Sequence, residues 1–316
     1  MPTAAETADH SDVVVVGSAN VDLVVELTAL PLPGETVLAL DSHVLAGGKG
    51  GNQATAVARL GRRVALVGRC GADDAGALVR NRLDAEGVDV SWFLPTEGVA
   101  TGQALVMVDA AAENSIVVIA GANGRVTPRD AEAARDLLAR AAVVVAQLEI
   151  PLEAVTEAAR LTRGTFVLNA APAGPLPAEL LALVDVLVVN QTEFATVIGG
   201  DADADASVVA ALLAGQPGGV RRVVITRGSE GARVWDGVRL TDIAAPRVDV
   251  VDTTGAGDTF VGALADALAG GDDLIGAAQW AVAAASLSTQ ALGATSGMPT
   301  AADVEQLLAR EGANPP

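Results

Sequence analysis

The chain has 316 residues, 51% of them hydrophobic, which is enough to bury a large core as one α/β domain or two smaller ones. Its formal net charge of −19 argues against a general binder of nucleic-acid backbone, which relies on clustered lysine and arginine. The single cysteine excludes an intrachain disulfide, and two isolated histidines offer neither a zinc cluster nor a serine–histidine pair. Any anionic ligand must therefore be held by a local site.

Residues 1–12, "MPTAAETADHSD", are polar and acidic with no apolar centre, so they predict a disordered tail and not a signal peptide. No apolar run reaches membrane-spanning length. With the lone cysteine, these features predict a cytoplasmic protein that binds neither a membrane nor nucleic acid.

Short β-branched runs alternate with stretches of helical period along the rest of the chain. The expected strands lie at 13–16, 64–67, 143–146, 165–169, 186–190 and 223–226. The expected helices lie at 51–60, 74–85, 130–140, 152–162, 192–199, 256–269, 275–290 and 301–310. Continuous apolar strands separated by helices predict an α/β fold, a doubly wound and mostly parallel sheet with helices on both faces.

Two segments break this alternation, because in them strand follows strand. One is "VDLVVEL" at 21–27, and the other joins 101–109 to 114–123 through the turn "AAAE" at 110–113. We expect them to form a small antiparallel β lid, built from about 18–45 and 100–121, on a single domain over 13–316.

Two clusters in the first quarter of the chain carry polar groups. In "GSANVDLVV", Asn20 and Asp22 alternate along a strand, although a turn and a solvent-exposed face are alternative interpretations. In "AGGKGGNQA", at 46–54, four glycines surround Lys49 and precede Asn52 and Gln53. Glycines let the backbone approach a ligand, and Lys49 and Asn52 supply polar groups for hydroxyls. The spacing is not that of a Walker A loop, and a plain turn is the alternative.

Two later clusters follow predicted core strands. Asn190 ends one strand and Glu193 lies one helical turn further, facing the crevice in which doubly wound sheets bind ligands. A helix cap with a capping-box glutamate is equally consistent with this pattern. Thr226, Gly228 and Gly231 follow another strand in the same way.

The stretch "VDTTGAGDTFVGAL", at 251–264, places Asp258 after three small residues at a helix start. A helix start carries unpaired N–H groups and attracts anions, so Asp258 is either a cap or a base. Phosphoryl transfer from a nucleotide to an alcohol needs a base, donors for the moving phosphoryl group and a cation. Asp258 and the amides of Gly255, Ala256 and Gly257 could supply the first two, and a simple cap does not explain the two glycines.

These stretches resemble a known family. "AGGKGGNQATAVARLG" and "DTTGAGDTFVGAL" are similar to the two signature stretches of the ribokinase-like (PfkB) carbohydrate kinases. "TGQALVMVD", "QLEIPLE", "VVNQTEF" and "TRGSEG" follow the order of its ribose-phosphorylating branch, and the resemblance runs from about Val13 to Leu308. It implies ATP-dependent, in-line phosphorylation of the 5-hydroxyl of D-ribose to D-ribose 5-phosphate, with Mg²⁺ on the nucleotide and K⁺ as a monovalent activator.

The resemblance also assigns residues, position by position. The implied sugar contacts are Asn20, Val21, Asp22, Gly48, Lys49, Gly50, Gly51, Asn52, Glu149 and Asp258. The implied nucleotide site comprises Asn190, Thr226, Arg227, Gly228, Ser229, Glu230, Gly231, Gly257, Asp258 and Val282, with Glu193 organising Mg²⁺ through water. Asp258 becomes the base, beside an anion hole of Gly255, Ala256 and Gly257.

The implied monovalent-cation loop consists of Asp252, Thr254, Ser288, Ala291, Gly293 and Gly297. Relatives often carry serine at the position of Gly297, so a hydroxyl ligand is either absent or supplied by Ser296; backbone carbonyls need no particular side chain. Val282 replaces a common polar residue, which leaves adenine mainly apolar contact. The lid is implied to cover the sugar and to join two subunits in a homodimer. The alternatives are a kinase for deoxyribose or fructose, or a silent sugar or nucleotide sensor, against which Asp258 and its glycines count.

Overall fold

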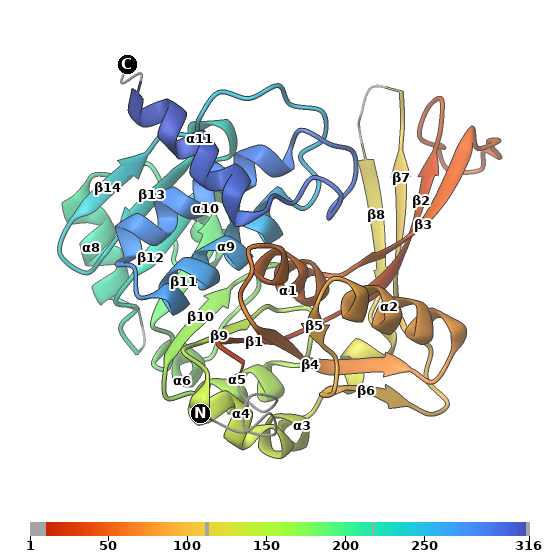
Figure 1. Cartoon of the computed structure of the whole chain (residues 1–316), viewed down its shortest axis with the longest axis horizontal. Helices are drawn as coiled ribbons and strands as arrows, with labels where there is room; N and C mark the ends of the chain where they lie inside the picture. Colours follow the sequence, from red (N-terminus) through yellow and green to blue (C-terminus); the bar gives the residue numbers. More distant parts are fainter. Residues whose placement is uncertain (1–10, 111–113, 217, 314–316) are drawn as a thin grey trace.

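The computed structural model describes residues 11–110, 114–216 and 218–313 (Figure 1). Within them, a ten-stranded sheet has the order β14-β13-β12-β11-β10-β9-β1-β4-β5, and β6 also pairs with β4. Its strands are β1 (Val13–Val16), β4 (Val64–Gly71), β5 (Val88–Asp89), β6 (Phe93–Thr96), β9 (Val143–Ala146), β10 (Thr165–Asn169), β11 (Val186–Asn190), β12 (Val223–Thr226), β13 (Ala232–Trp235) and β14 (Leu240–Ile243). The strands from β12 to β6 are parallel to one another, β13 is antiparallel to β12, and β14 is antiparallel to β13.

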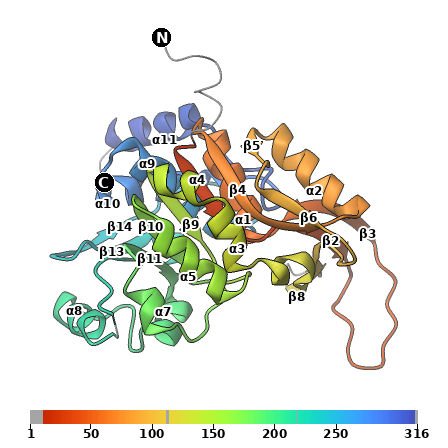
Figure 2. The same ribbon diagram turned by 90° about the horizontal axis from the view of Figure 1, so that it is seen from below.

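Helices cover both faces of this sheet, because successive strand residues point to opposite sides. Val13 and Val15 join one buried apolar cluster, and Val14 and Val16 join the other. The first cluster includes α1 (Lys49–Arg59), α2 (Asp74–Ala85), α9 (Ala256–Gly270), α10 (Leu274–Ser288) and α11 (Ala301–Ala313). The second includes α3 (Pro128–Ala133), α4 (Arg135–Arg140), α5 (Leu152–Leu161), α6 (Ala178–Leu181), α7 (Gln191–Val197) and α8 (Ala206–Ala214) (Figure 2). The predicted fold class is confirmed.

A separate four-stranded sheet projects from one end of the body (Figure 1). It contains β2 (Asn20–Glu26), β3 (Asp41–Gly47), β7 (Gly102–Val108) and β8 (Asn114–Ile119), in the order β3-β2-β7-β8. We call this sheet the lid. The prediction of a purely antiparallel lid is wrong: β2 and β3 form one antiparallel pair and β7 and β8 another, but β2 and β7 are parallel. Both pairs begin at the body and run outward first, so their adjoining strands share a direction.

Several elements differ from the sequence-based expectation. The helix expected over 130–140 is divided into α3 and α4, with the break at Ala134. The short helix α6, the helix α8 and the β13–β14 pair were not expected. Residues 1–10 of the expected tail and residues 111–113 of the expected turn lie outside the described residues. Among the helices in the described ranges, none is long and apolar enough to cross a membrane.

Candidate active site

The glycine-rich start of α1 packs directly on the backbone that leaves β1. Gly48 has φ 83° and caps α1, and a Cβ there would lie 2.8 Å from the backbone N of Asn20. A Cβ on Gly50 would lie 2.6 Å from the carbonyl O of Ser18. Only glycine permits both the left-handed conformation and this approach. The packing brings the start of α1 beside the start of β2.

Buried hydrogen bonds fix the polar side chains at this junction. The Glu149 carboxylate accepts from the backbone N–H of Lys49 at 3.0 Å and from the Ser18 hydroxyl at 2.5 Å. Oδ1 of Asn20 accepts from Nδ2 of Asn123 at 2.7 Å. Ser18 and Asn123 were missed by the sequence analysis, because nothing in their local pattern distinguishes them from loop residues.

Asp22 presents an unpaired carboxylate in the same place. Its Oδ1 is buried and has no hydrogen-bond partner among the described residues, and a Cβ on Gly47 would lie 2.0 Å from its Oδ2. Burial, followed by the charges of Glu149 and Asp258, raises the pKa of Asp22 to about 6. A buried acceptor without a donor suits a ligand that brings hydroxyl groups.

Asp258 lies in the first turn of α9 and is 9% exposed. The N-cap of α9 is Gly255, so Asp258 is the third helical residue, and its carboxylate bonds across to α1. Oδ2 accepts from Nδ2 of Asn52 at 2.9 Å, and Oδ1 accepts from Nε2 of Gln53 at 3.0 Å. Burial raises the pKa of Asp258, while the charge of Lys49 and these two amides oppose that rise. The carboxylate is thus held in place by two amides and partly desolvated.

The loop before α9 exposes backbone donors beside this carboxylate. Gly255 has φ 77°, and a Cβ there would lie 2.2 Å from the carbonyl O of Ala294. The N–H of Ala256 donates to the carbonyl of Thr253 at 3.2 Å, so the expected three-amide anion hole loses this donor. The N–H groups of Gly257 and Asp258 have no acceptor in the described part of the chain. An anion at this helix start would meet these two amides and the positive end of the dipole.

A cavity of about 170 Å³ opens between the start of α9 and the carboxyl ends of β10, β11 and β12. It is lined by Lys49, Asn169, Ala171, Val188, Val189, Asn190, Glu193, Thr226, Gly255, Gly257, Asp258 and Val261. Pockets that enclose a whole small molecule are usually larger, about 300–1,000 Å³. The cavity is therefore too small to enclose a whole nucleotide.

The cavity contains part of the nucleotide set implied by the resemblance. Five residues of that set line it: Asn190, Glu193, Thr226, Gly257 and Asp258. Asn190 and Glu193 also form a reciprocal capping box, each backbone N–H donating to the other side chain at 2.8 Å. The capping and cavity-lining interpretations of this pair therefore hold together.

The other implied nucleotide residues do not line the cavity. Arg227 pairs with Asp203 at 3.1 Å and with Glu230, and Gly228–Glu230 forms a 3-10 turn that Gly231 ends. Val282 is buried in the apolar core of α10. Conversely, the sequence analysis missed Asn169, although it ends strand β10 just as Asn190 ends β11. Its position at the carboxyl end of a predicted core strand was the signal that could have identified Asn169 as a cavity-lining residue.

The implied cation loop is brought together around Asp252. Its Oδ1 accepts from the N–H and hydroxyl of Thr254 at 2.9 and 2.7 Å, and its Oδ2 accepts from the N–H of Gly293 at 2.7 Å. Burial opposes ionisation, yet the hydrogen bonds from Gly293 and Thr254 hold the pKa of Asp252 below its usual value. Ala291 lies between α10 and Gly293 in the same loop.

Gly297 packs closely against the end of α10. A Cβ there would lie 2.1 Å from the carbonyl O of Ser288, so a serine could not be placed at 297 without moving the Ser288 backbone. The Ser296 hydroxyl donates to the carbonyl of Leu292 and, at 3.4 Å, to that of Gly293. The donor set for a cation is therefore the Asp252–Thr254 segment with backbone carbonyls, a composition that fits K⁺.

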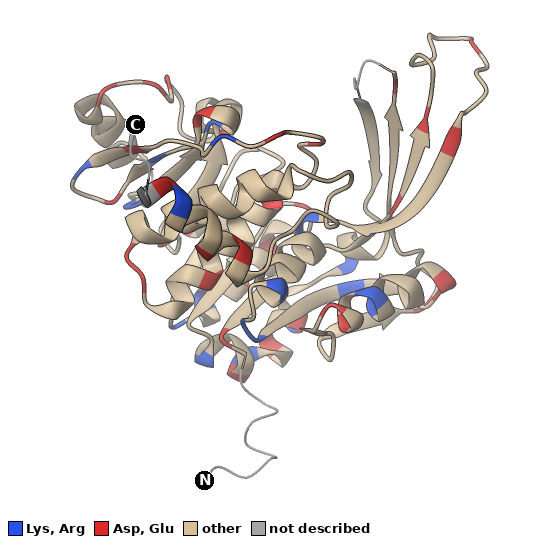
Figure 3. Cartoon of the chain, turned by 45° about the horizontal axis from the view of Figure 1, so that its top comes forward, with Lys and Arg blue, Asp and Glu red and all other residues tan. Residues whose placement is uncertain are grey.

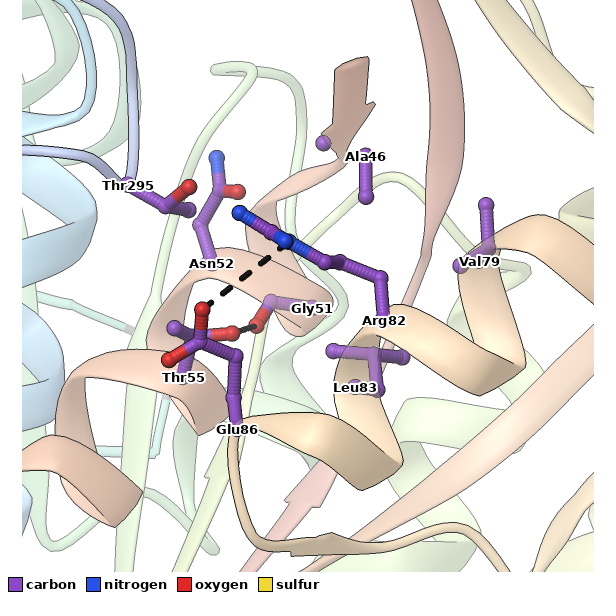
Figure 4. Close-up of a pocket in the computed structure, with 10 residues that line it drawn as sticks. Ala46, Gly51, Asn52, Thr55, Val79, Arg82, Leu83, Glu86 and Thr295 are labelled. Carbon is purple, nitrogen blue, oxygen red and sulfur yellow. Dashed lines mark hydrogen bonds and ion pairs between the residues drawn. The ribbon is translucent and has the colours of Figure 1, made fainter.

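A second cleft, of about 10 Å³, separates α1 from α2 (Figure 4). Gly51 and Asn52 line it, and the Arg82 side chain extends across it while pairing with Glu86 at 3.9 Å. Its volume is close to that of one water, so it cannot hold a sugar.

Comparisons with known proteins agree with this geometry. The family model for pfkB carbohydrate kinases matches residues 10–301. A ribokinase from Bacillus subtilis is 39% identical over 300 residues, covering 94% of this chain and 99% of its own length. A deoxyribokinase from Salmonella typhimurium is 32% identical over 302 residues, covering 94% and 98%. The structure of Arabidopsis thaliana ribokinase complexed with ribose and ATP has a TM-score of 0.86 at 35% identity, over 95% of this chain and 99% of the other.

The chain therefore belongs to the PfkB family of carbohydrate kinases, which are ATP-dependent.

Proposed function

We propose that this protein is a ribokinase that transfers the γ-phosphoryl group of ATP to the 5-hydroxyl of D-ribose. The observation that carries the proposal is the Asp258 carboxylate, held by Asn52 and Gln53 at the wall of the cavity and next to two open helix amides. Similarity to ribokinases over nearly the whole chain supports ribose as the sugar.

In this proposal the sugar lies between the start of β2 and the start of α1. The unpaired Asp22 carboxylate accepts hydrogen bonds from neighbouring sugar hydroxyls, and Lys49 and Asn52 supply donors. Asp258 receives the proton of the sugar's 5-hydroxyl while the oxygen of that hydroxyl forms a bond to the γ-phosphorus. The bond between the γ-phosphorus and the bridging oxygen of the β-phosphate breaks, and ADP is released. The amides of Gly257 and Asp258 stabilise the charge on the transferred group.

Two cations complete the proposed chemistry. Glu193 at the cavity wall would organise Mg²⁺ through water, and the Asp252–Thr254 segment with nearby carbonyls would hold K⁺. When bound, these ions offset phosphate charge and polarise the loop that carries Gly255 and Gly257.

The remaining proposals concern the state of the protein. We propose a homodimer joined through the lid, since the lid is implied to pair subunits and several of its apolar side chains are exposed. A cytoplasmic location remains a prediction from the single cysteine.

The sugar assignment is tested by ADP release with a panel of pentoses and hexoses, each with and without ATP. We expect kcat/KM for D-ribose to exceed that for 2-deoxyribose and fructose by at least roughly 10-fold, because one lost hydroxyl contact to a charged group has about that effect. A higher kcat/KM for 2-deoxyribose would reassign the substrate. No turnover with any sugar, despite measurable binding, would favour the sensor.

The base is tested by Asp258→Asn, which removes the proton acceptor with little change in shape. We expect turnover to fall roughly 10²-fold or more with near-normal thermal unfolding. Near wild-type turnover in this variant would contradict the role of Asp258.

A further inference from the structure

Gln53 is completely buried, and both N–H groups and the oxygen of its amide make hydrogen bonds. Its Nε2 donates to Oδ1 of Asp258 at 3.0 Å and to Oδ1 of Asn169 at 3.1 Å. Its Oε1 accepts from Nε2 of Gln147 at 2.6 Å. The side chain thus connects the proposed base to the cavity wall and to a second buried amide at the end of β9.

The polarity of this network is dictated from the base outward. An ionised carboxylate only accepts hydrogen bonds, so Gln53 must present its NH₂ group to Asp258. Its oxygen then faces Gln147, which must present its own NH₂ group. This arrangement leaves Oε1 of Gln147 buried without a partner among the described residues, beside Gly17. A buried unpaired oxygen is unfavourable, so the network is not explained as a device that maximises stability.

Close contact between α1 and α9 makes the connection possible. Gly262 lies one helical turn after Asp258, and a Cβ there would lie 2.6 Å from Cβ of Ala56 and 2.7 Å from the carbonyl O of Gln53. A larger residue at 262 would separate the helices. The glycine therefore keeps the Gln53 amide within reach of the carboxylate.

We propose that Gln53 is a positioning residue for catalysis, which fixes Oδ1 of Asp258 and keeps that carboxyl ionised, while Gln147 fixes the orientation of the Gln53 amide. The proposal rests on the proposed function, because it assumes that Asp258 is the base. Gln53 differs from Asn52, which also donates to Asp258 but lies at the edge of a cleft and is 6% exposed. Gln53 has no exposed surface, so it acts on the substrate only through the two partners that line the cavity, Asp258 and Asn169.

The proposal predicts a change in pH dependence. The charged groups that face Asp258 are Lys49, which favours its ionised form, and Glu149 and Asp22, which oppose it. An amide that donates to the carboxylate also favours the ionised form. Removing the Gln53 amide should raise the pKa of Asp258, and the acid limb of the kcat–pH profile should move to higher pH.

The main test replaces Gln53 with Met, which is similar in length but cannot donate. We expect kcat to fall roughly 10-fold to 100-fold, the effect of one hydrogen bond to a charged group, with KM for the sugar within about 3-fold of wild type. The acid limb should shift upward by about half a pH unit or more. Gln53→Glu places a second carboxyl beside Asp258 and should shift the limb further.

The control is Thr156→Val, which removes a largely buried hydroxyl group on α5. That hydroxyl donates to the carbonyl of Leu152 on the same helix and does not contact the site. It should lower thermal stability without moving the acid limb. Gln147→Met leaves the Gln53–Asp258 contact in place and should give a smaller shift in the same direction, so it keeps the proposal testable if Gln53→Met does not fold.

Asp258→Asn separates the two hypotheses. If Asp258→Asn is inactive while Gln53→Met keeps the wild-type kcat and acid limb, the positioning role is wrong and the base remains. If Asp258→Asn retains turnover, the proposed base itself is wrong.

Discussion

The charged form of Asp22 is unfavourable for folding, and the proposed function gives this same carboxylate the role of binding the sugar. Its pKa rises from 3.8 to about 6 because burial, Glu149 and Asp258 all disfavour the charged form. A carboxyl with a raised folded-state pKa stabilises the fold less as pH rises: the loss begins near pH 4 and is complete above about pH 6. The shift corresponds to about 3 kcal/mol as an upper bound, since one pKa unit is about 1.4 kcal/mol.

Asp22→Asn should therefore raise the free energy of unfolding at pH 7.5, by up to about 3 kcal/mol, and have little effect near pH 4. The same substitution should weaken ribose binding roughly 10-fold or more, because it removes a charged acceptor. Urea unfolding at the two pH values and calorimetric titration with ribose measure both effects. Asp84→Asn, at an exposed position on α2, is the matched control. A variant that is destabilised at pH 7.5, or that binds ribose normally, would contradict this account of Asp22.

At the scale of elements, Arg59 connects two helices to the proposed cation loop. Its Nε and Nη2 donate to the two carboxylate oxygens of Glu86, at 2.8 and 2.9 Å. Its Nη1 donates to the carbonyl of Thr295 at 2.5 Å and to that of Met298 at 3.3 Å. The hydrogen bond from Arg59 lowers the pKa of Glu86. The side chains of Arg59 and Glu86 are each about one-fifth exposed. We call the hydrogen bonds of Arg59 to Glu86 and to the two carbonyls the Arg59 fork; it holds the loop next to Gly297 against α1 and α2.

Cation activation should depend on this fork. In the wild type, K⁺ should activate turnover more than Na⁺ at equal ionic strength, because a carbonyl-lined site discriminates by ion size and ligand number. Arg59→Met should raise the half-saturating K⁺ concentration roughly 3-fold to 10-fold, since the loop carbonyls lose their tether. Turnover measured against K⁺ concentration, with choline chloride replacing it, tests this.

The matched control is Arg63→Met, which removes a similar but more exposed two-pronged pair with Asp12. It should leave the potassium response unchanged. Equal responses of the two variants would show that the Arg59 fork does not act on the cation loop.

The elements that could be predicted from the sequence are those whose burial produces a regular local pattern of apolar residues. The strand at 186–190 is buried on both faces, so its continuous apolar run predicted a core strand. Its last residue, Asn190, marked the carboxyl edge of the sheet, the edge at which ligands of doubly wound sheets bind. The parallel pairing of β2 with β7 could not be predicted from the sequence, because it depends on the directions in which two distant segments leave the body. Gln53 and Gln147 are 94 residues apart, and neither position indicates that their amides form a hydrogen bond next to Asp258.

For the molecule as a whole, the lid is unusual in its surface. Figure 3 shows no Lys or Arg on its strands and only a few acidic residues. In β8, which forms one edge of the lid, the four side chains from Ile116 to Ile119 are each at least 50% exposed. Successive residues of a strand point to opposite faces, so both faces of this edge are apolar. Exposed apolar edge strands normally gain a partner, which favours association of two chains through the lid.

Val117 and Val118 offer a matched pair for testing this, since they are 50% and 53% exposed and point to opposite faces of β8. Val118 pairs with Ala104, which pairs with Asp22, so Val118 lies on the face that carries Asp22. We expect the wild type to have the mass of two chains by light scattering at micromolar concentration. Aspartate introduced on the face that is covered in the dimer should give the mass of one chain, because an unpaired charge cannot be buried there, while aspartate on the other face should leave the dimer intact. A wild type with the mass of one chain, or a dimer that survives both Val117→Asp and Val118→Asp, would show that the lid does not join the subunits.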